Sequence, residues 1–214
     1  GKVYDRILPW EHADLPDNAF RDGQIADETV ATIRRAHKSG KPFFIAPGFQ
    51  KPHLPFVCPK KYYDLYSDQD VQRSPNPARS PGQPLFTITK GINGIEIFGD
   101  FPKTGLADKD IVHGLRSYYA CVSFIDAQVG KILDELDRLK LMDSTVVVVL
   151  SDHGFHLGDH GNWGKATCFE HATRSPLFVR LPRMKTAGIQ TDALVEYVDL
   201  FPTVLDLCGF DVPQ

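Results

Sequence analysis

The run at residues 145–150 constrains the fold most, because four consecutive valines lie between Thr145 and Leu150 without a polar interruption. β-branched residues favour strands, and a continuous apolar run is typical of a strand buried on both faces. Strands of that kind occur mainly in parallel sheets covered by helices. The run therefore predicts a buried, parallel strand. Residues 42–46 and 176–179 form shorter apolar runs between breakers and predict two more strands, the first also buried on both faces.

Amphipathic segments alternate with these strands. Residues 111–139 carry apolar side chains at spacings of mainly three and four, which predicts a helix of about 30 residues with a core-facing stripe. Shorter helices are predicted at 22–37, ending at Ser39-Gly40, and at 194–207, where Asp199 ahead of Pro202 gives a cap-like start. Strands alternating with helices predict an α/β layered sheet.

Composition excludes several classes of protein. The 214 residues are 42% hydrophobic with a net charge of −3, which is typical of a globular domain and gives no excess of positive charge for nucleic acid. No apolar run approaches the roughly 20 residues that span a bilayer. The four cysteines are widely spaced and predict mostly buried thiols rather than a zinc ribbon.

The start at Gly1, without Met or a hydrophobic leader, indicates a mature or excised piece without a targeting segment. Residues 51–105, rich in Pro and Gly, predict a long surface excursion.

The segment after the valine run concentrates chemically active side chains. Ligands of parallel sheets bind at the carboxyl ends of the strands, and Asp152 and His153 follow this one directly. A carboxylate beside an imidazole is a plausible metal-ligand pair, and Lys165 would neutralise an anion held by that metal. A zinc site made of His153, His156 and His160 is an alternative, although the neighbouring glycines disfavour the helix that would align His156 and His160.

A second candidate, His53, follows the run at 42–46. Prolines 52 and 55 stiffen its loop, and histidine titrates near neutral pH. This side chain is therefore suited to donate a proton to a leaving group. If both runs are parallel strands of one sheet, His53 and the Asp152 segment open on the same edge.

Taken together, six motifs resemble the sulfatase family, and within it the iduronate sulfatase-like branch. The resemblance runs from about residue 22 to residue 213. The motifs read Lys41-Pro-Phe-Phe-Ile, Lys51-Pro-His-Leu-Pro-Phe56, Ser151-Asp-His-Gly154, Leu157-Gly-Asp-His-Gly161, Trp163-Gly-Lys165 and Asp199-Leu-Phe-Pro-Thr203. The resemblance implies an alkaline-phosphatase-like fold, a three-layer α/β/α sandwich with a mostly parallel sheet. This chain would supply the central-to-distal part of the catalytic domain.

The resemblance also implies roles for individual residues. Asp152 and His153 would bind a divalent metal, usually Ca²⁺ in the family, with Mg²⁺ as the alternative. Lys165 would contact the sulfate, and His53 would assist departure of the alcohol. His156, with Trp163, would shape the sugar pocket. The family's nucleophile is a formylglycine made from Cys or Ser in a Cys/Ser-x-Pro/Ala-x-Arg motif, and this chain contains no such motif.

The implied reaction is hydrolysis of a sulfate ester, of a small molecule or a sulfated sugar, outside the cytoplasm. The formylglycine would come from outside this segment, so the isolated chain is expected to be inactive. Two alternatives remain open. One is a phosphodiesterase or phosphonate hydrolase of the same fold, and the other is a binding module without catalysis. The sequence leaves the oligomeric state open.

Overall fold

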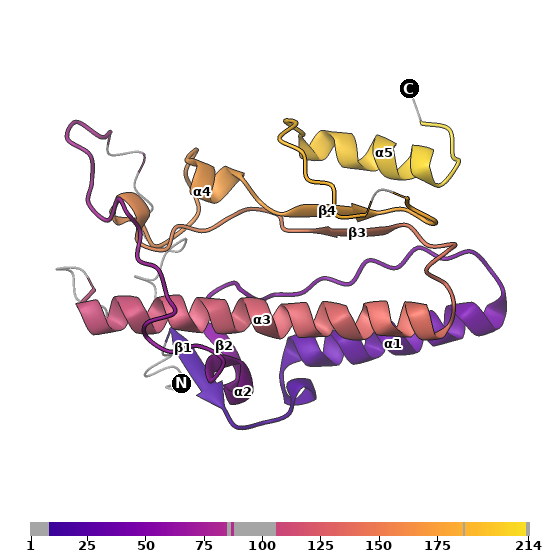
Figure 1. The fold of residues 1–214 in the computed structure, drawn as a ribbon, viewed down its shortest axis with the longest axis horizontal. Coiled ribbons are helices and arrows are strands. Elements are labelled where there is room, and N and C mark those ends of the chain that lie inside the picture. Colours follow the sequence, from indigo (N-terminus) through magenta and orange to yellow (C-terminus); the bar gives the residue numbers. More distant parts are fainter. Residues whose placement is uncertain (1–8, 85–86, 88–105, 186, 213–214) are drawn as a thin grey trace, which may run out of the picture. The chain divides into compact units, whose positions relative to one another are not determined.

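The computed structural model describes residues 9–84, 87, 106–185 and 187–212 (Figure 1). The chain divides into two compact units. Unit 1 consists of Gly1–Glu135 and Asp152–Ser175, and unit 2 of Leu136–Ser151 and Pro176–Gln214. All five residues predicted for the site, His53, Asp152, His153, His156 and Lys165, belong to unit 1.

Unit 1 is built on two long helices and a small parallel sheet. In chain order its elements are β1 (Trp10–Ala13), the 3₁₀ helix η1 (Asp17–Ala19), α1 (Arg21–Ser39), β2 (Phe56–Pro59), α2 (Lys60–Tyr63), α3 (Asp108–Arg138, whose last three residues fall in unit 2), the 3₁₀ helix η5 (Asp159–Gly161) and α4 (Glu170–Thr173). Strands β1 and β2 pair in parallel, with Trp10 opposite Phe56.

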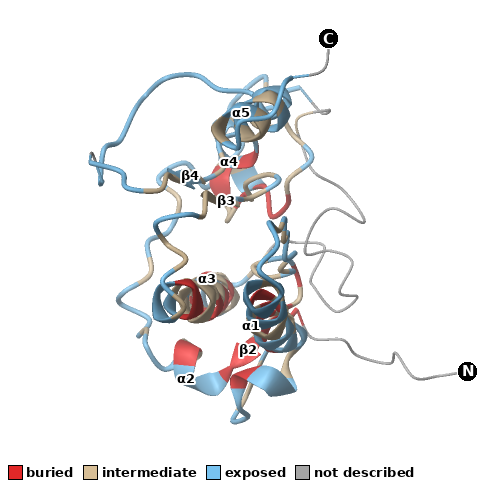
Figure 2. Cartoon of the chain, turned by 90° about the vertical axis from the view of Figure 1, so that its right-hand side faces the viewer, coloured by how far each residue is buried: buried red, intermediate tan, exposed pale blue. Residues whose placement is uncertain are grey.

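The two predicted long helices are confirmed. Helix α1 has an acid, Asp22, in its first turn and ends at Gly40, whose φ of 67° is the left-handed conformation that glycine adopts most easily. Helix α3 has 31 residues. The helices lie side by side in Figures 1 and 2, and Arg34 of α1 donates two 2.9 Å hydrogen bonds to the buried carboxylate of Glu135 in α3.

The apolar core of unit 1 lies between β2 and α3. Its fully buried members include Phe56, Leu115 and Phe124, and Figure 2 shows the buried residues gathered on α1, α2, α3 and β2. Cys58 and Cys121 are buried here as free thiols, as predicted, whereas the other two cysteines are exposed.

One buried carboxylate, that of Asp17, ties η1 to α2 and α3. It accepts hydrogen bonds from the Tyr62 hydroxyl at 2.9 Å and the Gln128 amide at 3.1 Å, and Lys61 Nζ lies 2.6 Å away. Burial alone would raise the pKa of Asp17, but the hydrogen bonds from Lys61, Gln128 and Tyr62 outweigh it and lower the pKa to about 2.

Unit 2 contains β3 (Val147–Leu150), β4 (Leu177–Arg180), the 3₁₀ helix η6 (Tyr197–Asp199) and α5 (Leu200–Leu207). Both strands were predicted, but the prediction of a buried, parallel strand is wrong. β3 and β4 pair antiparallel, Val147 lies opposite Arg180, and Leu150 is 46% exposed. Parallel pairing needs a crossover connection, usually a long helix, whereas the only α-helix between these strands is the four-residue α4.

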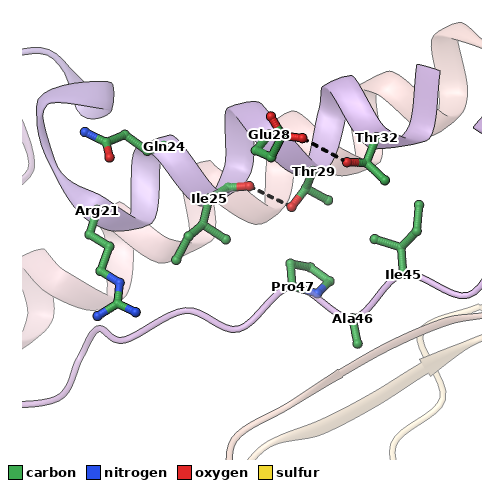
Figure 3. A pocket seen from close by; sticks show the side chains of 9 residues that line it. All are labelled: Arg21, Gln24, Ile25, Glu28, Thr29, Thr32, Ile45, Ala46 and Pro47. Atoms are coloured by element: carbon green, nitrogen blue, oxygen red, sulfur yellow. Dashed lines mark hydrogen bonds between the residues drawn. The ribbon is translucent and has the colours of Figure 1, made fainter. Parts of the chain in front are cut away.

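The prediction of a buried strand at residues 42–46 is also wrong. These residues form no strand, and Phe44 is 84% exposed. A strand buried on both faces needs neighbours to pair with, and the part of the chain that the structure describes supplies none here. The segment instead borders an open groove of about 350 Å³ on α1, where Ile45 and Pro47 point toward the helix that carries Ile25 and Ala46 points away from it (Figure 3).

Three further expectations differ in extent. The described residues form two two-stranded sheets, β1–β2 and β3–β4, rather than one mostly parallel sheet in a three-layer sandwich. The excursion predicted at 51–105 begins with β2 and α2, while residues 85–86 and 88–105 lie outside the described part. The helix predicted from 194 begins only at Leu200, after η6, where the Asp199 carboxylate accepts a 3.1 Å hydrogen bond from the Glu196 amide. None of the helices in the described part of the chain has both the length and the hydropathy of a membrane span.

Candidate functional site

The loop that follows β3 is anchored to the core of unit 1 by its apolar side chains. Phe155 meets Phe56 edge-on at 6.1 Å and stacks on Tyr118 at 6.2 Å, measured between ring centroids. Leu157 packs against the same core, and Trp163 is 7% exposed within it. These alternating anchors fix the backbone of residues 152–165, so the polar side chains between them have defined positions.

Gly154 fixes the start of this loop against α4. Its amide donates a 2.8 Å hydrogen bond to the carbonyl of Ala172. A Cβ atom at this position would lie 2.1 Å from the carbonyl oxygen of His171, far inside van der Waals contact. The glycine of the Ser-Asp-His-Gly motif is therefore required by close backbone approach.

Asp152 and His153 place two possible metal-ligand atoms side by side. Asp152 is 82% exposed, and its Oδ2 lies 3.3 Å from Nε2 of His153. Nδ1 of His153 is 2.7 Å from the carbonyl of Gly154, and because a carbonyl only accepts, Nδ1 carries the proton. In the neutral ring Nε2 then has the lone pair, next to a carboxylate oxygen. This donor pair fits two ligands of one divalent cation.

Lys165 and His156 lie further along the same loop, at different depths. Lys165 is half-buried and follows Gly164, whose carbonyl accepts a 2.7 Å hydrogen bond from the His156 amide. His156 is fully buried, and its Nε2 lies 2.7 Å from the Thr167 hydroxyl. Burial, followed by the nearby His171, lowers the pKa of His156. A direct contact of His156 with a sugar stays a prediction, since the ring lies beneath the surface.

His53 is exposed on the separate loop before β2. Its amide donates to the carbonyl of Gln50 at 2.9 Å, and its Nδ1 lies 2.6 Å from the Leu54 carbonyl, which assigns the proton to Nδ1. The ammonium of Lys51 donates to the carbonyls of His53 and Pro55 at 2.6 and 2.8 Å. Burial lowers the pKa of Lys51. The loop thus holds the imidazole by bonds to its own backbone.

Asp22 is a positioning residue that the sequence did not reveal. It is 2% exposed in the first turn of α1, and its two carboxylate oxygens accept the amides of Gln50 and Lys51 at 2.8 and 2.9 Å. The sequence shows it only as a first-turn acid, and the partners lie 28 and 29 positions away. Helix α1 therefore positions the loop that contains His53, through the hydrogen bonds that Asp22 accepts.

We expect Asp22→Ala to destabilise the protein by about 1–3 kcal/mol, because two partly buried amides lose their acceptor. Urea unfolding followed by circular dichroism measures this loss. Asp27→Ala, at a half-exposed position of the same helix, is the control and should change the free energy of unfolding by under about 0.5 kcal/mol. Equal stability of Asp22→Ala and the parent protein would contradict the positioning role.

The structure places four of the five predicted residues on one anchored loop. Asp152 and His153 are brought together directly, while His156 supports the backbone next to Lys165. His53 belongs to the separate loop that Asp22 and Lys51 hold.

Comparison with solved structures defines the class of fold. A protein solved with its substrate D-glucosamine-2-N,6-O-disulfate matches 91% of this chain with a TM-score of 0.75 at 20% identity, and the match covers 50% of that protein. The phosphonate monoester hydrolase of Agrobacterium radiobacter matches 92% with a TM-score of 0.75 at 25% identity, over 40% of its own length. The fold is therefore the alkaline-phosphatase-like α/β fold of sulfatases, present in part.

The sequence comparisons identify the family within that fold. The sulfatase family model matches residues 3–210, and the chain belongs to the sulfatase family, a family of sulfuric ester hydrolases. It is 32% identical to iduronate 2-sulfatase of Mus musculus over its whole length and 33% identical to a sulfatase of Formosa agariphila over 94% of its length. It spans 44% and 38% of these relatives, less than half of each.

Proposed function

We propose that the protein containing this chain hydrolyses a sulfate ester of a sugar or other small alcohol, with this chain providing the metal-binding and sulfate-binding side of the site. The observation that carries the proposal is the Asp152–His153 donor pair on the loop that also presents Lys165. That arrangement joins a cation site to a fixed positive charge, which suits an anionic substrate.

Each side chain then has one task. Asp152 and His153 hold a divalent cation, Ca²⁺ or Mg²⁺, which when bound stabilises negative charge on the sulfate oxygens. The ammonium of Lys165 pairs with a sulfate oxygen by a charge-assisted hydrogen bond. The imidazolium of His53, whose Nδ1–H stays bonded to the Leu54 carbonyl, donates its Nε2 proton to the departing alcohol oxygen and becomes neutral. The nucleophile, a formylglycine in the family, is contributed from outside this segment.

The longer protein would also complete the sheet. We propose that the longer protein has a mostly parallel sheet within a three-layer α/β/α sandwich. The exposed Phe44 and the partly exposed valines of β3 support this, because apolar side chains at these positions need cover. A location outside the cytoplasm stays a prediction from the family resemblance.

Comparing two ester classes tests the function. The full-length protein should hydrolyse an aryl sulfate and a sulfated monosaccharide with higher kcat/KM than an aryl phosphodiester, and the 214-residue chain alone should hydrolyse none of them. The likeness to a phosphonate monoester hydrolase makes that hydrolase the second candidate, which faster turnover of the phosphodiester or of a phosphonate ester would favour. Binding of a sulfated sugar without turnover of any ester would instead indicate a binding module.

A further inference from the structure

A second group of side chains that can bind a metal includes neither Asp152 nor His153 and comes from the same loop and from α4. It consists of His156, Asp159 and His171, and one ligand atom from each lies within 4.8 Å of the other two. Unlike the exposed Asp152, two of the three are buried: His156 is fully buried and Asp159 is 2% exposed. This group is not used by the proposed hydrolysis.

Asp159 is oriented from both sides. Its Oδ1 accepts a 2.6 Å hydrogen bond from the hydroxyl of Ser74, a residue 85 positions away. Its Oδ2 lies 3.2 Å from Nδ1 of His171 and 3.4 Å from Nε2 of His160. A carboxylate held by a hydroxyl on one oxygen, with imidazoles around the other, is the arrangement in which a neighbouring group orients a metal ligand.

His156 provides the independent observation. Its Nε2 is engaged by the Thr167 hydroxyl at 2.7 Å, while its Nδ1 is buried and has no hydrogen-bond partner among the described residues. A buried polar atom without a partner costs about 1–3 kcal/mol, so native structures rarely leave one. The rings of His156 and His171 stack with their centroids 5.7 Å apart, and one ligand atom of each lies within 4.8 Å of a ligand atom of Asp159.

We propose that His156 Nδ1, Asp159 Oδ2 and His171 Nδ1 bind a zinc ion that staples the loop to α4. Two imidazoles and one carboxylate form a ligand set that zinc accepts, whereas Ca²⁺ prefers oxygen donors alone. Ligand atoms around a tetrahedral zinc lie about 3.3 Å apart, because each bond is about 2.0–2.2 Å long. Asp159 and His171 already have that spacing. One ring nitrogen of His156 lies within 4.8 Å of ligand atoms of both, about 1.5 Å more than that spacing.

The surroundings provide the remaining features of such a site. In the tautomer with the proton on His156 Nε2, the Thr167 hydroxyl accepts that proton and the lone pair lies on Nδ1. His171 is 52% exposed, so solvent reaches the cluster and a water completes the coordination. Because Lys165 lies between His156 and His171 in the chain, the ion would close a loop around the residue that is proposed to bind sulfate. The inference goes beyond the proposed hydrolysis and does not depend on it.

Zinc binding by the full-length protein tests the proposal. After removal of metals with a chelator, the protein is titrated with ZnCl₂ against a fluorescent zinc indicator, and Co²⁺ is added separately to record the absorption bands of tetrahedral cobalt. In an Asp152→Ala/His153→Ala background, which removes the other cation site, we expect one zinc per chain. His171→Ala and Asp159→Asn in the same background should each weaken zinc binding by about tenfold or more.

Two controls make the outcome decisive. His37→Ala removes an exposed histidine of α1 and should leave zinc affinity unchanged. Thermal unfolding in the presence of chelator shows that His171→Ala is folded, and added zinc should raise the melting temperature of the background protein but not of this variant. Absence of zinc binding in the background, or equal affinity in His171→Ala, would overturn the proposal and leave the cluster as a network of His–Asp ion pairs.

Discussion

Replacing Lys165 by methionine in the full-length protein should lower kcat/KM for a sulfate ester by roughly 10²–10³-fold. Methionine keeps an unbranched apolar stem and removes only the charge that is proposed to face a sulfate oxygen. The backbone next to this position is fixed by the hydrogen bond from the His156 amide to the Gly164 carbonyl and by the buried Trp163. We therefore expect no neighbouring cation to move in and replace the lost ammonium. Initial rates with an aryl sulfate measure the effect.

Two measurements separate this role from a structural one. Lys60→Met removes an exposed lysine of α2 that pairs with Asp64, and it should leave kcat/KM within about twofold of the parent protein. Lys165→Arg should recover part of the lost activity, because it restores the charge with a different geometry. Parent-like kinetics of Lys165→Met would contradict the sulfate-binding role.

Replacing His53 by alanine should slow hydrolysis by an amount that depends on the alcohol released. For an unactivated sugar sulfate, whose alcohol needs a proton as it departs, we expect a loss of about 10²–10⁴-fold in kcat/KM. For a nitrophenyl sulfate the leaving group carries its own negative charge well, so the loss should be much smaller. The ratio of the two rates, measured on the same preparation, isolates proton donation from binding.

The control for His53 is again His37→Ala, since this exposed histidine on α1 lies outside both loops. A variant that disturbs only the loop, such as Asp22→Ala, should lower kcat/KM for both substrates by the same factor, because it displaces the His53 imidazole without removing it. An equal loss on both esters in His53→Ala would therefore contradict the role as a proton donor.

The spacing of apolar residues in the sequence predicted the long helices well, but it predicted the pairing of the strands poorly. Helices α1 and α3 satisfy their hydrogen bonds within themselves, so apolar spacing and end residues such as Gly40 suffice to locate them. A strand takes its bonds from another segment, and the sense of β3 is set by the return of the chain to β4. Strand β1, which contains Glu11 and His12, gave no continuous apolar signal and was missed.

The site shows the same division between local and long-range information. Asp152 and His153 are neighbours in sequence, so their convergence is local and was predicted from a motif. Asp22 and Ser74 act on residues 28 to 85 positions away, and only the folded chain reveals those contacts. The Asp159–His171 pair also went unpredicted, because His171 reaches the loop through α4.

The exposed apolar side chains of unit 2 bear on how this chain behaves in solution. Among the described residues β3 and β4 pair only with each other, which leaves an open backbone edge on each, while Phe178, Val198 and Phe201 are 65%, 72% and 64% exposed. Open edges beside apolar surface are templates for association between molecules. Produced as this segment alone, the chain should self-associate as its concentration rises. Its solubility will then depend on how well the apolar side chains and open strand edges of unit 2 are covered.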